Sequence, residues 1–473
     1  ITGDLTEEKV AAQKAWLDPE IDKLGLVYGK AVECHWRRRI HHVPVHVQAL
    51  DGWVKDRVQT IFDSGFLTMG FAIDRFQRIR NLGMLHPLGG DPGLNHLWYE
   101  VRYFDFEWER AQAMAAEEVL VIPLITQEST GGSSVDVALP SAEELLAYDT
   151  LEIDLQSWCN DHLEGDPENG CPEWDTGASL HVAEVPIEAD AEAQVDGTCE
   201  PGDGADVAAE TMPCTCSVPS GGTRPSVRTC QEGGAAFGAC LCNGTWEIAR
   251  WITTYSREGR WVSDASFFLP IIAGGGTVRM NYSPGNTYIT NLSLRLSNRD
   301  KADRAASVTP LYQGGSFNSA YNEAYEPMEV MIPETAKRAE IVALITGHGF
   351  GVEIAGCAEF CNHTHHFTVG EGEVVHDNPW VGNFYGCADQ VPDGVVPNQY
   401  GTWTLGRGGW CPGLDVKPFV ADVTEFLTPG EPATLSYEAL FMGKTYEPQP
   451  NPDPSANGFP GNIWMYSWLV TYE

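Results

Sequence analysis

Cysteine, carboxylate and histidine side chains come close together in residues 357–366, which read CAEFCNHTHH. Two cysteines four residues apart can close a small disulfide loop that holds Glu359 at a fixed angle. His363 and His365 are two residues apart, so on a strand both imidazoles lie on one face, a spacing that suits a metal ion. The stretch therefore predicts a hydrolase site or a metal site, with a plain disulfide hairpin and satisfied surface histidines as the third interpretation.

Two further clusters combine cysteines with charged and aromatic residues. PEWD (172–175) follows the pair Cys159 and Cys171, and RGGW (407–410) directly precedes Cys411. A carboxylate beside a tryptophan can be a general base with a tuned pKa, and a second carboxylate can orient a water molecule. Asp175 and Glu359 are the candidates for these roles. The alternative is that such residues only end a strand or brace a loop.

Arg407 could hold such carboxylates through its planar set of donors. The chain has no Gly-x-Ser-x-Gly elbow, no phosphate-binding P-loop and no His-Glu-x-x-His motif. Serine-hydrolase, nucleotide-binding and zinc-protease chemistry are therefore disfavoured.

The composition is that of a large, acidic, multidomain globular protein. The chain has 473 residues, 43% hydrophobic residues and a formal net charge of −37. Strong negative charge opposes binding to nucleic acid or to an anionic membrane, and no run of 18 apolar residues predicts a transmembrane helix. Thirteen cysteines, many closely spaced, favour an oxidising compartment. We expect a secreted or periplasmic protein, processed or truncated at Ile1.

Charge and hydrophobic periodicity divide the chain. Residues 1–110 are nearly neutral, whereas residues 111–473 carry almost all of the excess negative charge. The first part is predicted to contain helices, and the rest shows short runs with the period of two that is typical of strands. Helices are expected over residues 7–17, 56–82 and 107–119, and strands over 151–156, 292–296 and 340–345.

A cysteine-rich segment interrupts the strand pattern at residues 184–245. Its six cysteines allow fifteen pairings, and disulfides are favoured over zinc because acidic residues flank them. The expected fold class is mainly β, with two antiparallel sandwiches or jelly rolls. We predict an α-containing N-terminal region over residues 1–130, a first jelly-roll domain over 131–305 with the insertion 184–245, and a second jelly-roll domain over 306–473.

Over residues 133–473 the chain resembles the bacterial peptide:N-glycosidase F family, whose members hydrolyse the side-chain amide of glycosylated asparagine. The resemblance rests on rare motifs in a fixed order: CPEWD (171–175), EIARWIT (247–253), ITGHG (345–349), CAEFC (357–361) with His365, GTW (401–403) and RGGWCPG (407–413). It implies two adjacent jelly-roll β-sandwich domains with the active site between them. The N-terminal region lies outside it.

The resemblance also implies roles for individual residues. Asp175 falls on the primary catalytic aspartate, Glu359 on a supporting glutamate and Arg407 on an active-site arginine. Implied disulfides are Cys159–Cys171, Cys357–Cys361 and Cys387–Cys411, and candidate substrate-binding residues are Glu173, Trp174, Thr176, His348 and Trp410. The implied enzyme is a peptide-N4-(N-acetyl-beta-glucosaminyl)asparagine amidase that uses no metal or other cofactor, acts as a monomer on N-glycoproteins or glycopeptides, and converts asparagine to aspartate.

Three positions depart from the family pattern. Thr176 stands where the family has an arginine, and a family glutamate and tryptophan align near Ser283 and Gly285. A non-catalytic glycan-binding module on the same fold is therefore the first alternative. The second is a copper-dependent monooxygenase-like protein, in which His363, His365 and His366 would bind the metal.

Overall fold

The computed structural model describes residues 69–73, 79–84, 93–116, 118–130, 132–160, 170–183, 212–217, 223–230, 245–453, 455 and 457–473. The chain divides into two compact units, Ile1–Glu109 and Arg110–Glu473. The three candidate catalytic residues all lie in the second unit. The predicted domain limits near residues 130 and 305 stay predictions.

Helices and 3-10 turns are few and mostly short among the described residues. The longest is α4 (Gly93–Ala116). It includes most of the helix expected over 107–119 and ends three residues before the expected end. The others are α5 (Ala142–Leu145), η3 (Ser266–Phe268), α6 (Leu269–Ile272), η4 (Tyr321–Ala324), η5 (Ala388–Asp393) and η6 (Thr424–Phe426). No helix in the described part of the chain is long and apolar enough to cross a membrane.

Part of the N-terminal expectation is wrong. β1 (Met69–Ile73) and β2 (Ile79–Met84) form an antiparallel pair, and all of β1 and most of β2 fall in the stretch 56–82, for which a helix was expected. Its mixed apolar spacing fitted neither a helix nor a strand cleanly, and pairing between the two segments decides the structure. The expected helix over 7–17 lies outside the described residues, and so do Cys199, Cys240 and Cys242 of the segment 184–245. Within that segment, β7 (Met212–Ser217) pairs with β8 (Thr223–Cys230).

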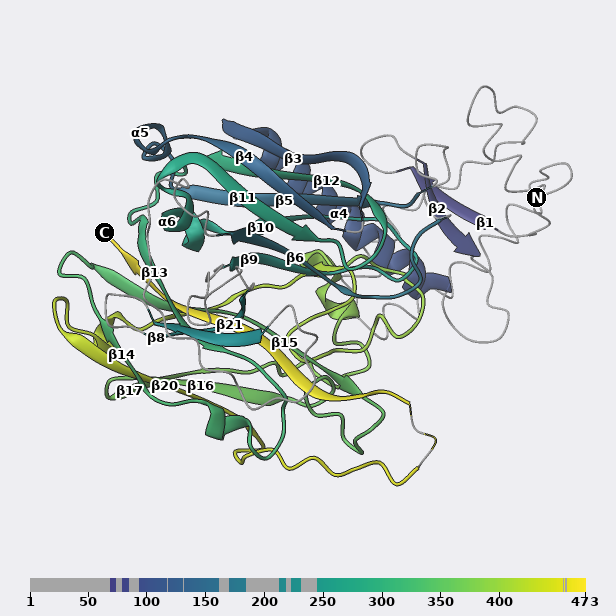
Figure 1. Cartoon of the computed structure of the whole chain (residues 1–473). Coiled ribbons are helices and arrows are strands. Elements are labelled where there is room, and N and C mark those ends of the chain that lie inside the picture. Colours follow the sequence, from purple (N-terminus) through teal and green to yellow (C-terminus); the bar gives the residue numbers. More distant parts are fainter. Residues whose placement is uncertain are drawn as a thin grey trace, which may run out of the picture. The chain divides into compact units, whose positions relative to one another are not determined.

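The first sandwich consists of two antiparallel sheets. One has the order β10-β5-β12-β3 and the other β18-β9-β6-β11-β4 (Figure 1). The strands are β3 (Val119–Thr130), β4 (Ser133–Ser141), β5 (Thr150–Trp158), β6 (Gly177–Ala183), β9 (Thr245–Ile252), β10 (Gly259–Asp264), β11 (Gly275–Ser283), β12 (Tyr288–Ser297) and β18 (Leu414–Asp415).

The alternating apolar residues from which two strands were predicted lie opposite each other in the sheet. Leu151, Ile153 and Leu155 of β5 lie opposite Leu296, Leu294 and Leu292 of β12. All six are at most 1% exposed. A buried side chain of this size contributes about 1.5–3 kcal/mol, so the period of two in these segments is enough to fix which face of the sheet forms the core.

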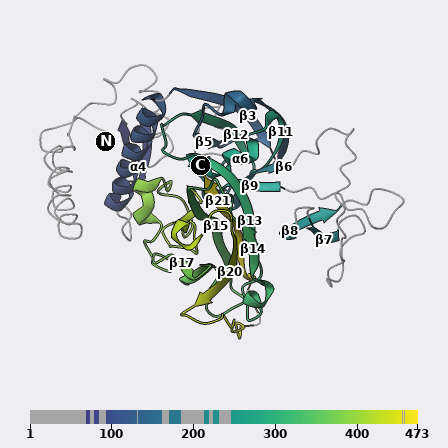
Figure 2. The ribbon, with the colours of Figure 1, turned by 90° about the vertical axis from the view of Figure 1, so that its left-hand side faces the viewer.

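The second sandwich also has two antiparallel sheets. Their orders are β13-β21-β15-β19 and β14-β20-β16-β17, and both sheets contribute to one hydrophobic core. The strands are β13 (Ala305–Gln313), β14 (Met328–Met331), β15 (Arg338–Phe350), β16 (His363–Val369), β17 (Gly372–His376), β19 (Phe419–Asp422), β20 (Pro432–Phe441) and β21 (Phe459–Tyr472). Figure 2 shows the labelled strands of the second sandwich on one side of β9 and β6, and other strands of the first sandwich, such as β3, β5 and β12, on the opposite side. The expected fold class, two adjacent β-sandwich domains, is confirmed.

A buried arginine joins the two sandwiches. Arg250 of β9 is 4% exposed and makes a two-pronged ion pair with Glu247, with both N–O distances at 2.7 Å. Its Nη1 donates to Thr346 Oγ1 of β15 at 2.8 Å and to the carbonyl of Trp464 of β21 at 2.7 Å. One side chain thus donates hydrogen bonds to acceptors in both sandwiches.

We expect Arg250→Leu to lower the free energy of unfolding by about 3–5 kcal/mol, because Glu247 would keep a buried charge without its partner. The measurement is urea denaturation of the purified protein. The matched control is Arg279→Leu, which breaks an ion pair with Asp136 whose side chains are 56% and 54% exposed, and which should cost less than about 1 kcal/mol. Equal losses for the two variants would contradict a structural role for the buried pair.

Candidate active site

Three disulfide-bonded loops carry the charged residues singled out from the sequence. The disulfides are Cys159–Cys171, Cys357–Cys361 and Cys387–Cys411. Asp175 follows the first loop and lies two residues before the start of β6. Glu359 lies inside the second loop, between β15 and β16, and Arg407 lies inside the third loop. The first loop belongs to the first sandwich and the second loop to the second, so the charged groups meet where the two sandwiches adjoin.

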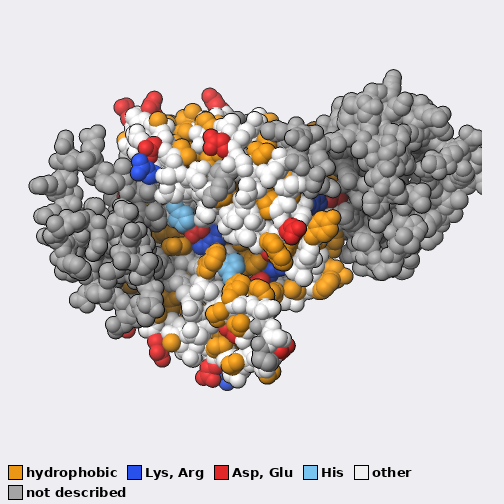
Figure 3. All heavy atoms as spheres, turned by 45° about the vertical axis from the view of Figure 1, so that its right-hand side comes forward, with side chains coloured by type: hydrophobic (Ala, Val, Ile, Leu, Met, Phe, Trp, Pro, Cys, Tyr) orange, Lys and Arg blue, Asp and Glu red, His pale blue; other side chains and the backbone are white. Residues whose placement is uncertain are grey.

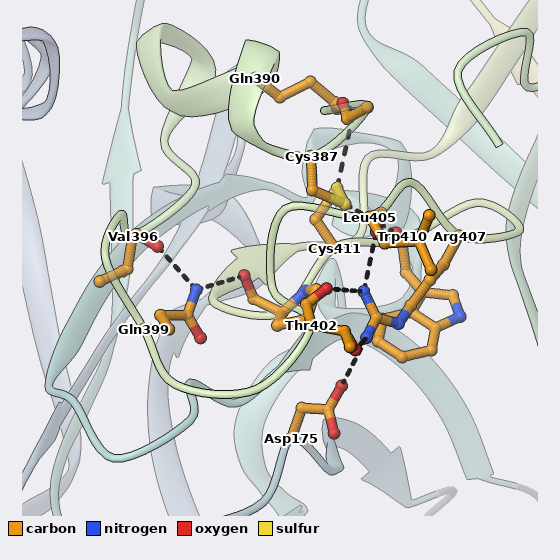
Figure 4. Close-up of a disulfide and its surroundings, with 12 residues drawn as sticks. Asp175, Cys387, Gln390, Val396, Gln399, Thr402, Leu405, Arg407, Trp410 and Cys411 are labelled. Carbon is orange, nitrogen blue, oxygen red and sulfur yellow. Dashed lines mark hydrogen bonds and ion pairs between the residues drawn. A yellow bond between two sulfur atoms is a disulfide. The ribbon is translucent and has the colours of Figure 1, made fainter. Parts of the chain in front are cut away.

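Arg407 is buried, at 2% exposed, and its guanidinium contacts both carboxylates. The Nη2 atom is 3.9 Å from Asp175 Oδ2, and the Nε atom is 3.4 Å from Glu359 Oε1. The other edge is fixed by its own loop, because Nη1 donates to the carbonyls of Leu405 and Thr402 at 2.8 and 3.2 Å (Figure 4). Among the residues that the structure describes, the Nε–H has no well-aligned hydrogen bond besides its ion pair with Glu359.

Burial makes both carboxyl groups weaker acids than usual. It raises the pKa of Asp175, and the Arg407 guanidinium and a hydrogen bond from Tyr255 offset only part of the effect. It also raises the pKa of Glu359 to about 7, with the negative charge of Asp175 adding to burial. A pair of carboxyl groups with raised pKa values in one partly buried site is typical of acid–base chemistry near neutral pH.

Backbone N–H groups hold Glu359 from two sides. Gly349 N donates to Glu359 Oε2 at 3.0 Å, and Gly408 N donates to the Glu359 carbonyl at 2.7 Å. Gly408 in turn accepts a hydrogen bond from Gly347 N at 2.7 Å. The motifs ITGHG, CAEFC and RGGW, which are separate in the sequence, are therefore hydrogen-bonded to each other around this carboxylate.

Tyr255 is a site residue that the sequence reasoning missed. Its hydroxyl donates to Asp175 and accepts from Arg407 Nη2 at 3.4 Å. The ring is 8% exposed, and burial raises the pKa of the hydroxyl well above its usual value, so the hydroxyl keeps its proton. Tyr255 lies two residues beyond the motif EIARWIT, and its only sequence signal is that proximity.

The five candidate substrate-binding residues have different environments. Glu173 and Trp174 are exposed, and Trp174 is 68% exposed. The Thr176 hydroxyl is 3.3 Å from that of Thr253, which ties the chain after Asp175 to the end of β9. Trp410 is 5% exposed and donates from Nε1 to the carbonyl of Gly347. Trp174 is thus the most accessible aromatic surface among the five.

His348 lies between two tryptophans. Its ring stacks on Trp410 at a centroid distance of 5.1 Å and lies 4.4 Å from Trp464. Burial lowers the pKa of His348 to about 3, so the ring is neutral at physiological pH, and its Nε2 is bonded to Thr346 Oγ1 at 2.9 Å. A neutral, sandwiched imidazole of this kind serves as a rigid wall of the site.

Trp464 is a second residue that sequence reasoning missed. It is 48% exposed, and its ring packs against Gly177, two residues after Asp175. Figure 3 shows one face of the molecule on which charged and histidine side chains gather across the middle, between hydrophobic side chains. Trp464 of β21 thus adds an exposed aromatic surface from the second sandwich, next to the segment that follows Asp175.

The position near Gly285, where the family tryptophan aligns, has no room for a side chain. Gly285 has φ +71°, and a Cβ there would lie 2.6 Å from Thr176 Oγ1 and 2.7 Å from the carbonyl oxygen of Gly177. Ser283, where the family glutamate aligns, is exposed at the end of β11. Neither position supplies a carboxylate or an aromatic ring to the site.

The histidines of the opening motif are hydrogen-bonded to the protein. His363 and His365 lie on one face of β16, as the spacing predicts, but all four of their ring nitrogens are engaged by each other, by Ala358 O or by Tyr437. His366 points to the other face, where it contacts Glu373. Within the described residues no group of three or more histidine, cysteine, aspartate or glutamate side chains is placed to hold a metal ion.

Residues 316–470 match the family model described as the C-terminal domain of peptide-N-glycosidase F. A curated relative, peptide-N(4)-(N-acetyl-beta-D-glucosaminyl)asparagine amidase F of Elizabethkingia miricola, is 24% identical over 225 residues. That alignment covers 43% of this chain and 60% of the relative, so the chain spans less than two thirds of the length of this relative.

A solved structure of such an amidase has the same fold. A crystal structure of peptide-N(4)-(N-acetyl-beta-D-glucosaminyl)asparagine amidase at 2.2 Å resolution is 14% identical, with a TM-score of 0.50 over 75% of this chain and 96% of that chain. A structure of PNGase F, titled a glycosylasparaginase from Flavobacterium meningosepticum, is 15% identical, with a TM-score of 0.47 over 75% and 96% of the two chains. The resemblance found in the sequence is thus confirmed, since residues 316–470 match the model of the family's C-terminal domain and the chain is similar in sequence to a curated amidase.

Proposed function

We propose that the protein is an amidase that cleaves the asparagine-linked glycan amide of N-glycoproteins or glycopeptides. The observation that carries this proposal is the contact of one buried guanidinium with two carboxylates, one from each sandwich. The curated relative is named as an enzyme of this class, and the motifs that carry Asp175, Glu359 and Arg407 are the ones on which the sequence resemblance rests.

In the proposed reaction Asp175 is the general base. It takes a proton from a water molecule whose oxygen forms a bond to the amide carbon of the substrate asparagine. The C–N bond then breaks, the proton passes to the leaving nitrogen, and the products are an aspartate side chain and a glycosylamine. Tyr255 fits this role of Asp175, because its hydroxyl donates to the carboxylate and fixes its orientation.

Glu359 and Arg407 are proposed to organise the water and the amide. A water molecule that attacks with a lone pair must direct both hydrogens to acceptors, and the ionised carboxylate of Glu359 supplies the second acceptor. The Nε edge of Arg407, which faces both carboxylates, supplies positive charge where the carbonyl oxygen becomes negative. Arg407 is already fixed by hydrogen bonds to the carbonyls of its own loop. The free-energy cost of positioning its charge is therefore met during folding and not during the reaction.

The surroundings of the site fit a neutral, carbohydrate-bearing substrate. Trp174 and Trp464 present exposed aromatic surfaces close to Asp175, and aromatic side chains with a few polar groups typically line ligand sites. The net charge of −37 disfavours nucleic acid and anionic membranes as partners. We also propose that the protein acts as a monomer in a secreted or periplasmic setting, where the three disulfides would persist.

Asp175→Asn is expected to lower kcat for glycan release by about 10²–10⁴-fold, because the water loses its base. The measurement is the release of glycan from a denatured N-glycoprotein. The control is Asp389→Asn, which alters an exposed carboxylate of the Cys387–Cys411 loop and should leave the rate unchanged. Glycan binding by the wild type without any release would instead support the non-catalytic module.

The rate should also depend on pH in a definite direction. Burial and the charge of Asp175 raise the pKa of Glu359 to about 7, so below this value Glu359 is protonated and becomes a poorer hydrogen-bond acceptor for the water. We expect kcat to rise as the pH increases through about 7 and then to level off. Glu359→Gln should be slower and should lose this rise, and an unchanged pH profile in that variant would assign the titration to another group.

Trp464→Ala is expected to raise KM roughly tenfold or more, with a smaller effect on kcat, because an exposed aromatic surface next to Asp175 is lost while the charged groups stay in place. The comparison is Phe350→Ala, which removes another exposed aromatic side chain, 46% exposed, from β15. Steady-state kinetics with a glycopeptide measure both. An equal rise in KM for the two variants would show a general surface effect.

A further inference from the structure

Three buried polar side chains of the second sandwich have no part in the proposed chemistry. His363 and His365 of β16 are 1% and 0% exposed, and Tyr437 of β20 is 4% exposed. Tyr437 Oη is 2.7 Å from His365 Nδ1, His365 Nε2 is 2.9 Å from His363 Nδ1, and His363 Nε2 is 2.8 Å from the carbonyl oxygen of Ala358. They form one continuous hydrogen-bonded chain.

The hydrogens in this chain have a fixed order. Burial lowers the pKa of His363 to about 4 and holds that of His365 well below its usual value, so each ring is neutral and carries one N–H. The Ala358 carbonyl can only accept, so His363 carries its hydrogen on Nε2 and accepts at Nδ1. His365 must then donate from Nε2 and accept at Nδ1 from the Tyr437 hydroxyl. Every ring nitrogen has a defined role.

The chain ends at the residue that precedes Glu359. Ala358 lies in the disulfide loop Cys357–Cys361, and its carbonyl oxygen is packed tightly against the RGGW loop: a Cβ on Gly408 would lie 2.4 Å from that oxygen and 2.9 Å from His363 Nε2. Gly408 also donates to the Glu359 carbonyl. A shift of the Ala358 carbonyl would therefore move both the peptide of Glu359 and the backbone next to Arg407.

We propose that Tyr437, His365 and His363 are positioning residues that fix the disulfide loop, and with it the carboxylate of Glu359, from the core of the second sandwich. The inference rests on the proposed function, in which Glu359 orients the attacking water. The five-residue disulfide loop is held at its ends by the Cys357 and Cys361 side chains, whereas the directional hydrogen bond from His363 fixes the orientation of a peptide between them. None of the three side chains touches the substrate.

The principal test compares two tyrosine variants in the same core. Tyr437→Phe removes the hydroxyl that donates to His365. The matched control, Tyr312→Phe, removes a buried hydroxyl that donates to the Leu435 carbonyl at 2.7 Å, from a ring that stacks on Tyr437 at 5.6 Å. We expect Tyr437→Phe to lower kcat roughly ten- to hundredfold with KM nearly unchanged, because the water is misplaced. Tyr312→Phe should leave kcat unchanged at a similar loss of Tm.

Equal kcat values for the two variants would overturn the proposal. A second comparison uses His363→Gln, whose amide can still donate to the Ala358 carbonyl, and His363→Leu, which cannot. We expect the glutamine variant to retain at least about tenfold more kcat than the leucine variant. If the two variants are equally slow at equal Tm, His363 acts only through packing and the proposal fails.

A measurement without substrate separates this inference from the proposed function. The amide resonances of Gly349 and Gly408 report on Glu359, because both N–H groups donate to it. In NMR spectra they should shift in Tyr437→Phe and stay in place in Tyr312→Phe. If the wild type releases no glycan but these resonances shift, the proposed function fails and the positioning chain stands. If they do not shift, the positioning chain fails whatever the activity.

Discussion

The site depends on the buried charge of Arg407. A guanidinium that is removed from water is costly unless its donors and its charge are matched, and no single segment of this chain matches it. Two loop carbonyls take one edge, and carboxylates from both sandwiches face the other. The charge is therefore compensated only when the two sandwiches are docked and the three disulfide loops meet. Assembly of the charged site and assembly of the fold are the same event.

Arg250 shows the same principle without an evident chemical role. It too is buried, pairs with a carboxylate on its own strand and reaches hydrogen-bond acceptors on β15 and β21. One of those acceptors, Thr346 Oγ1, also bonds His348, whose ring separates Trp410 from Trp464. The structural contact between the sandwiches thus continues into the wall of the site, so a change in docking would displace aromatic and charged groups together.

The sequence predicted the parts of this architecture that are local. Alternating leucines predicted β5 and β12, and the motifs around Asp175, Glu359 and Arg407 identified the three loops. Tyr255 and Trp464 were missed because tertiary packing alone brings them to the site: the hydrogen bond between Tyr255 and Arg407 joins residues 152 positions apart. The His363–His365 spacing was ambiguous for the same reason. It suits a metal ion or a ring-to-ring hydrogen bond equally, and Tyr437, 72 residues further on, determines which nitrogens are engaged.

The departures from the family pattern have a structural meaning at Gly285. A side chain there would collide with Thr176 and Gly177, the two residues that follow Asp175, so the missing tryptophan does not leave an empty subsite. The turn instead packs directly against the aspartate segment, and Asn286 in the same turn donates to the carbonyl of Trp174 at 2.6 Å. A large side chain could support the aspartate segment through its ring. Here contact with the backbone of the turn supports that segment instead. Trp464 of β21 adds an exposed aromatic surface beside Gly177, in addition to Trp174 of the first sandwich. Recognition of a substrate would therefore draw on the second sandwich more than the family pattern implies.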